Sequence, residues 1–121
     1  MAAFHTRSVA AATYHADAIL RICRQYAPPG IRIAGEIDYQ AEEPLTLALA
    51  EAVRLDGDIT INMAALAFID AFCARMIAET AKMLAGSRTV VLQCPPEVAA
   101  GFARLGVDGL PGVRLEIARE Q

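Results

Sequence analysis

Apolar positions recur at intervals of three and four residues between residues 8 and 27, which is the periodicity of one helix face. The stripe consists of six residues: Val9, Ala12, Ala16, Ile19, Cys23 and Tyr26. Leu20 and Ile22 widen it, Ser8 suits the N-cap, and Pro28-Pro29-Gly30 ends the pattern. We therefore predict an N-terminal amphipathic helix that packs on the rest of the protein or on a second chain.

Beyond residue 30, short apolar or alternating segments take turns with helical patterns. The patterns predict strands at 31–37, 59–63, 88–94 and 113–117, and helices at 42–55, 71–84 and 97–105. This alternation is typical of an α/β fold with a mainly parallel, four-stranded sheet and right-handed crossovers. We divide the chain into the N-terminal helix with its connector (residues 1–30) and one α/β domain (residues 31–121).

The net charge of −3 is unevenly distributed. Residues 1–32 hold four arginines and one aspartate, a net +3, whereas the remainder holds seven basic and thirteen acidic residues, a net −6. An acidic body argues against nucleic-acid binding, because phosphates require a basic surface. The basic arm either packs against its own domain or a neighbouring copy, or it is an ordinary solvated helix face.

No apolar run reaches the roughly 18–20 residues of a membrane-spanning helix, and the first residues lack the order of a signal peptide. We expect a cytoplasmic protein without a membrane partner. Cys23, Cys73 and Cys94 are odd in number and form no CxxC pair, which is typical of free thiols. Only two histidines occur, both before the main body, so we expect no metal and no cofactor.

Residues 59–73 combine an apolar strand, a short turn and a helix that Asp70 opens. Such a junction exposes backbone amides and a helix N-terminus. Asp70 is suited to cap the helix and is also a candidate contact for a partner. Phe72 either folds into the core or forms an exposed aromatic anchor. The spacing points Cys73 inward, and no nearby histidine could activate it.

Two motifs carry a family resemblance. Gly35-Glu36-Ile37-Asp38 closes one strand, and Phe68-Ile69-Asp70 closes another about thirty residues later. Together with the order of elements, they resemble the STAS domains, which include the anti-sigma-factor antagonists of bacteria. The resemblance covers residues 31–117. It implies a small α/β domain that binds a protein partner, such as an anti-sigma factor, its kinase or another regulator, and catalyses no reaction.

The chain departs from the family pattern at two places. The pattern has hydroxyl residues directly after the aspartate, and a kinase phosphorylates a serine there. Ala71 and Phe72 occupy these positions, so the resemblance implies a degenerate phosphosite. The family's usual first strand is either absent or supplied by a few residues between Phe4 and Val9.

We predict a protein-interaction module in bacterial signalling and transcription regulation, lacking the serine switch. The expected partner-binding residues are Glu36, Asp38, Asp70, Ala71, Phe72 and Arg75. One alternative is a small-molecule sensor or carrier with an apolar pocket beneath the N-terminal helix. Another is a scaffold subunit or homodimer that assembles through that helix. An enzyme is not expected, because no acid, base and nucleophile converge.

Overall fold

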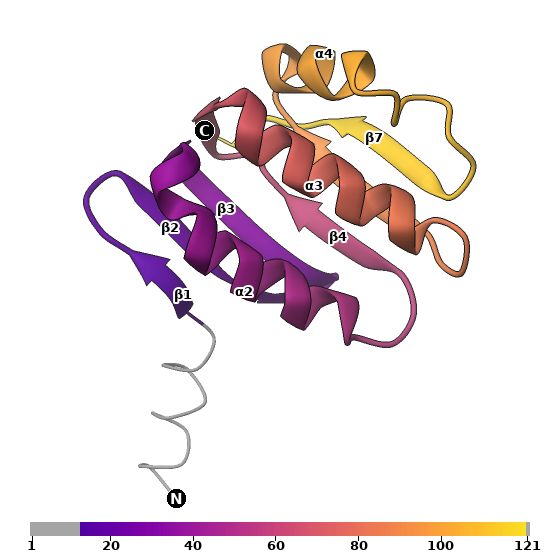
Figure 1. Cartoon of the computed structure of the whole chain (residues 1–121), viewed down its shortest axis with the longest axis horizontal. Helices are drawn as coiled ribbons and strands as arrows, with labels where there is room; N and C mark the ends of the chain where they lie inside the picture. The colour runs from indigo at the N-terminus through magenta and orange to yellow at the C-terminus, as the bar shows by residue number, and fades with distance from the viewer. Residues whose placement is uncertain (1–12, 121) are drawn as a thin grey trace, which may run out of the picture.

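The computed structural model describes residues 13–120, which form one mixed β-sheet with helices on one face (Figure 1). The strands are β1 (Thr13–Ala16), β2 (Leu20–Tyr26), β3 (Pro29–Ile37), β4 (Ile59–Asn62), β5 (Leu66–Ile69), β6 (Val90–Cys94) and β7 (Val113–Ile117). The helices are α2 (Glu42–Val53), α3 (Ala71–Leu84) and α4 (Pro96–Arg104), and the 3-10 turn η1 (Tyr39–Ala41) precedes α2.

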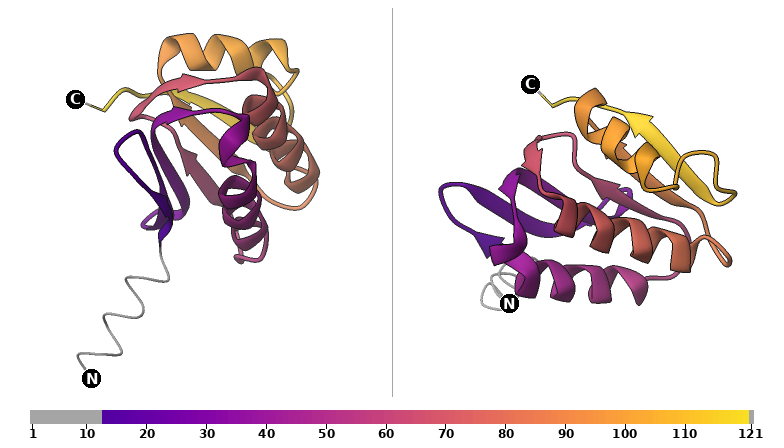
Figure 2. Two further views of the ribbon diagram at one scale, coloured as in Figure 1. Left: turned by 60° about the vertical axis from the view of Figure 1, so that its left-hand side comes forward. Right: turned by 45° about the horizontal axis from the view of Figure 1, so that its top comes forward.

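The strand order is β1-β2-β3-β4-β6-β7, and β5 pairs with the far end of β3. β2 pairs antiparallel with both β1 and β3, whereas β3, β4, β5, β6 and β7 are parallel. Each crossover proceeds in the same direction along the sheet, so all three helices cover the same face (Figure 2). The sheet is therefore larger than the predicted four strands. It is mixed rather than purely parallel, because β2 runs against the other six strands of the described residues.

The predicted N-terminal helix is wrong wherever the structure describes it. Residues 13–26 form the hairpin β1–β2, Ala27 lies in the turn that follows, and residues 8–12 lie outside the described residues. Two members of the apolar stripe, Ile19 and Tyr26, are 64% and 63% exposed. The buried positions are instead Leu20 and Ile22, which alternate with an exposed arginine as in a half-buried strand. The homodimer and pocket hypotheses assumed this helix, and both remain predictions.

The later elements match the sequence patterns closely. The helix at 71–84 and the strand at 113–117 have the predicted bounds, and the other predicted elements differ from the observed ones by at most two residues. The strand β5 was missed as a separate element, because residues 63–65 between it and β4 form a turn that the apolar sequence does not signal. None of the helices within residues 13–120 is long and apolar enough to cross a membrane.

The two faces of the sheet differ in chemistry. Under the helices, a continuous apolar core includes Ile33 of β3, Ile61 of β4, Leu92 of β6 and Phe102 of α4, all fully buried. The opposite face, which we call the open face, carries polar side chains of β2, β3, β4, β6 and β7. η1, α3 and α4 all begin just after the carboxyl ends of parallel strands, at one end of the sheet. In open α/β sheets this end commonly carries the binding site.

Candidate functional site

Asp70 joins the two segments that the sequence placed in the site. Its Oδ1 accepts a hydrogen bond from the backbone N–H of Cys73 at 2.8 Å, so it caps α3 as predicted. Its Oδ2 accepts a second bond, from the N–H of Tyr39 at 2.8 Å. The N–H of Asp70 donates to the carbonyl of Ile37 at 3.2 Å. One carboxylate thus fixes the first turn of α3 against η1.

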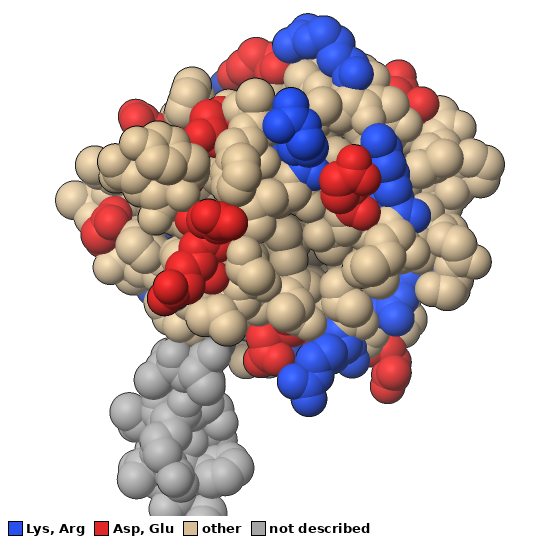
Figure 3. Space-filling view, viewed as in Figure 1, with Lys and Arg blue, Asp and Glu red and all other residues tan. Residues whose placement is uncertain are grey.

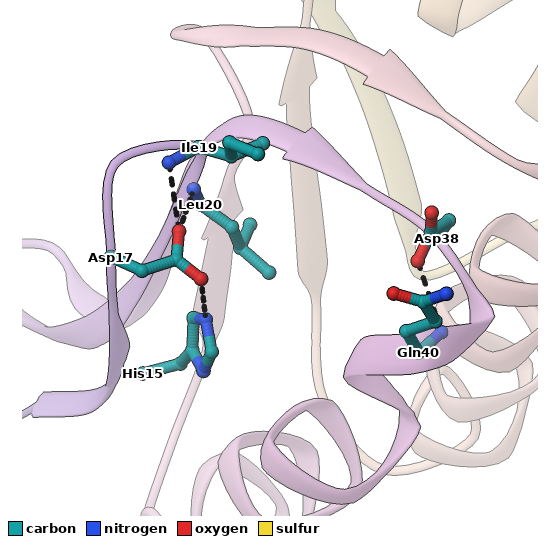
Figure 4. A network of polar contacts seen from close by, with 6 residues as sticks. All are labelled: His15, Asp17, Ile19, Leu20, Asp38 and Gln40. Atoms are coloured by element: carbon teal, nitrogen blue, oxygen red, sulfur yellow. Dashed lines mark hydrogen bonds and ion pairs between the residues drawn. The ribbon is translucent and has the colours of Figure 1, made fainter.

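The two other predicted carboxylates lie where β3 ends. Asp38 accepts a hydrogen bond from the N–H of Gln40 at 3.0 Å and so caps η1 (Figure 4). Glu36 is exposed, and its N–H donates to the carbonyl of Ile19 at 3.1 Å. The structure therefore brings the β3 end, η1 and the start of α3 together, as the predicted site requires.

Four large apolar side chains are exposed around this junction, and we call them the apolar rim. They are Ile19 (64% exposed), Tyr39 (63%), Phe68 (51%) and Phe72 (39%). Of the two alternatives for Phe72, the structure shows the exposed one, on the first turn of α3. Ala71 and Arg75 are also exposed on this helix.

A hollow of about 350 Å³ lies on one side of Phe68. Its lining includes Asp17, Glu36 and Asp38, together with His15, and we call it the acidic hollow. Asp17 Oδ1 accepts from the N–H groups of Ile19 and Leu20 at 2.7 and 2.8 Å, and its Oδ2 lies 2.8 Å from His15 Nε2 (Figure 4). These amide donors lower the pKa of Asp17 to about 2.

Sequence reasoning missed His15, Asp17 and Phe68 as site residues. Asp17 is four residues before Arg21, which resembles a helical ion pair, whereas in the structure it closes the β1–β2 turn. An aspartate that precedes an alternating apolar segment was the one signal that could have revealed the turn. The sequence showed Phe68 as part of a motif but not as a site residue. Its place in the site depends on β5, which puts its side chain between two hollows.

The thiols near the site are poor nucleophiles. Burial, with Asp70 nearby, raises the pKa of Cys73 to about 12, and burial raises the pKa of Cys94 to about 11. Both side chains are fully buried. Among residues 13–120, no group of three or more His, Cys, Asp and Glu side chains is arranged to hold a metal ion.

Hydroxyl groups are absent from the sequence around the start of α3. Residues 61–79 contain no serine, threonine or tyrosine. Of the two threonines that flank this stretch, Thr60 is buried, and the hydroxyl of Thr80 donates to the Met76 carbonyl at 3.0 Å. On the face of the described residues seen in Figure 3, acidic and basic side chains are interspersed and form no continuous basic patch.

A comparison with protein families matches the STAS domain to residues 25–119 of the chain. The matched range includes the end of β3, the start of α3 and every parallel strand of the sheet. A comparison with curated proteins found no match. Because the match covers most of the sequence and both segments of the site, the chain belongs to the STAS-domain family.

Proposed function

We propose that this STAS domain is a non-catalytic protein-interaction module in bacterial regulation, acting in the manner of an anti-sigma-factor antagonist but without a serine switch. The observation that carries the proposal is the apolar rim at the carboxyl end of the sheet. Single exposed apolar residues are common on protein surfaces, but four large ones around one helix start mark an interaction surface.

The physical basis is the burial of preordered aromatic rings. Phe68 and Phe72 expose 51% and 39% of their surface, and covering such rings contributes strongly to association. The two hydrogen bonds of the Asp70 carboxylate hold the start of α3 against η1. Docking then orders few additional groups, which reduces the entropic cost of association.

The polar contacts proposed for the partner surround these rings. Glu36 and Asp38 provide carboxylates at one side, and Arg75 provides a guanidinium group one turn into α3. Asp70 and Ala71 lie between them and complete the predicted set. The mixture of apolar centre and charged edge is the usual composition of a protein interface.

Docking is proposed to be constitutive. A phosphate group adds close to two negative charges, which would oppose burial in an interface. Ala71 and Phe72 cannot accept one. After incubation with a cognate anti-sigma kinase and ATP, mass spectrometry should find residues 61–79 unmodified. Phosphate on Tyr39, Thr60, Thr80 or Ser87, accompanied by loss of partner binding, would replace this proposal with a displaced switch.

The direct test compares exposed apolar residues inside and outside the rim. The partner is first captured from the source cell with the intact protein and identified by mass spectrometry. Its affinity is then measured for Phe72→Ala and for Met83→Ala, whose side chain is 64% exposed in the last turn of the same helix. Phe72→Ala should weaken binding about 10-fold or more, whereas Met83→Ala should leave it unchanged. Equal affinities for the two variants would refute the proposal.

A further inference from the structure

A second hollow, on the other side of Phe68 from the acidic hollow, forms an apolar groove of about 380 Å³. It lies between the first turn of α3 and α4, above β5. Its apolar lining consists of Ala67, Phe68, Ile69, Ala71, Ala74, Val98, Gly101 and Leu105. Because Phe68 borders both hollows, the groove is continuous with the apolar rim.

One face of α4 forms the outer wall of the groove. The lining residues Glu97, Val98, Gly101, Arg104 and Leu105 are separated by one, three, three and one residues, which places them on a single helical face. From Glu97 to Leu105 there are eight rises of 1.5 Å, which give a wall of about 12 Å, or two helical turns. The opposite wall is formed by Ala71 and Ala74, one turn apart on α3. Small side chains on both walls allow another backbone to approach closely.

The charged side chains at the groove differ in whether they have bonding partners. Glu97 is neutralised, because both of its oxygens accept from Arg119 at 3.0 and 2.8 Å. Asp70 directs both of its oxygens to backbone N–H groups. Arg104 has no ion-pair partner within residues 13–120, and its Nη2 lies 4.0 Å from where a Cβ on Gly101 would be. The groove therefore offers one guanidinium group that pairs with no carboxylate of residues 13–120, beside an apolar surface.

We propose that this groove receives an amphipathic α-helix of the protein partner, with about two turns in contact. The helix would carry apolar residues at positions i, i+3 or i+4, and i+7, and a carboxylate at the end that faces Arg104. This proposal rests on the proposed function, since it names the kind of segment that the interaction module binds. The groove between two helices matches the helix-in-groove mode of recognition, and its charge complements an acidic residue.

Gly101 offers a way to fill the groove without damaging the fold. It lies inside α4, and the nearest atom to an added Cβ is the flexible end of Arg104 at 4.0 Å. Gly101→Leu therefore fills the groove, and it replaces a poor helix former with a good one. Ala100→Leu is the matched control, because Ala100 is exposed on the same helix and does not line the groove. Thermal unfolding of both variants should show no loss of stability.

The test uses a displayed library of random 16-residue peptides, selected on the full chain. Enriched peptides should show apolar residues at helical spacing with an acidic residue. The tightest peptide, made synthetically, should bind Gly101→Leu at least 10-fold more weakly than the wild type and Ala100→Leu equally well. Arg104→Gln should weaken binding 2- to 5-fold. Failure to enrich any peptide, enrichment of peptides with strand-like alternation, or equal binding to Gly101→Leu would each overturn the proposal.

Measurements of affinity for the native partner distinguish the groove proposal from the broader proposal of a docking function. If the captured partner loses affinity for Phe72→Ala but not for Gly101→Leu, the docking function stands and the groove proposal is overturned. If it loses affinity for neither variant, both are overturned. Loss with both variants, and not with Ala100→Leu, is the expected result.

Discussion

The open face of the sheet and the apolar rim differ in the kind of side chain that each exposes. On the open face, polar side chains bond to one another: Asn62 donates to Gln25 at 2.8 Å, and Gln93 donates to Glu116 at 3.3 Å. At the rim, large apolar side chains stand exposed beside carboxylates. A satisfied polar surface gains little from being covered, whereas exposed rings gain from burial. The comparison supports our proposal that the partner docks at the end of the sheet rather than on its open face.

The largest contrast should come from substitutions at the two surfaces. The double variant Phe68→Ala with Phe72→Ala should weaken binding of the captured partner on the order of 100-fold, because two aromatic anchors are removed. Gln25→Ala with Gln93→Ala, on the open face, should change the affinity less than about 2-fold. Isothermal titration calorimetry measures both. A larger loss from the open-face pair would reverse the assignment of the binding surface.

Gly35 is expected to be indispensable for the shape of the rim. Its φ is +103°, and an added Cβ would lie 1.9 Å from the carbonyl oxygen of Ile19. Gly35→Ala should therefore lower the free energy of unfolding by about 2 kcal/mol or more, measured in urea. Gly86→Ala is the control, since nothing lies within 4 Å of an added Cβ there, and its effect should stay within about 0.5 kcal/mol. Similar values for the two variants would contradict the strain argument.

Asp70 combines a structural and a positioning role, which two substitutions can separate. Asp70→Ala removes the α3 cap and the bond to the Tyr39 N–H, and should destabilise the protein by about 1–2 kcal/mol. Asp70→Asn retains a capping oxygen and should cost less. Chemical denaturation gives both values. If Asp70→Ala were as stable as the wild type, the carboxylate would not be holding α3 and η1 together.

Asp17, in the acidic hollow, should make the free energy of unfolding depend measurably on pH at low pH. The pKa of Asp17 is lowered to about 2 from an ordinary value near 3.8, so its carboxylate stabilises the folded state above that ordinary value. This contribution is lost as the pH falls from about 4 toward 2. Asp17→Asn keeps an accepting oxygen but cannot titrate, so its unfolding free energy should fall less steeply over this range. Parallel curves for the two proteins would contradict the proposed linkage.

The smallest effect concerns the thiols. At pH 8, Cys73 and Cys94 are fully buried and have pKa values near 12 and 11, so their thiolate fraction is very low. Cys23 is half-buried on β2. Iodoacetamide should therefore modify Cys23 first, as peptide mass spectrometry can determine. Faster modification of Cys73 would indicate that the start of α3 opens readily.

The sequence predicted α3 well because all the signals for that helix are local. Asp70 caps it, its apolar residues keep helical spacing, and Gly86 follows its end. The hairpin β1–β2 was mistaken for a helix because Ala16, Ile19 and Cys23 keep helical spacing by coincidence. Pairing of β2 with β3 decides the outcome there, and that pairing is not visible in local periodicity.

The candidate site also combines features that local sequence predicts with features that depend on contacts between distant segments. The residues themselves predicted that Asp70 caps α3, and an exposed Phe72 was one of the two alternatives that they left open. The bond between Asp70 and the Tyr39 N–H could not, because it joins segments about thirty residues apart. The acidic hollow exists only because the β1–β2 turn contacts the end of β3, where the Glu36 N–H donates to the Ile19 carbonyl.

The central claim is that a partner docks at the carboxyl end of the sheet. Hydrogen–deuterium exchange of the intact protein, with and without its captured partner, tests it most directly. The account predicts slower exchange on binding for amides in residues 36–41 and 66–75, and no change in β6 and β7. Protection of β6 and β7, with none in residues 66–75, would contradict it.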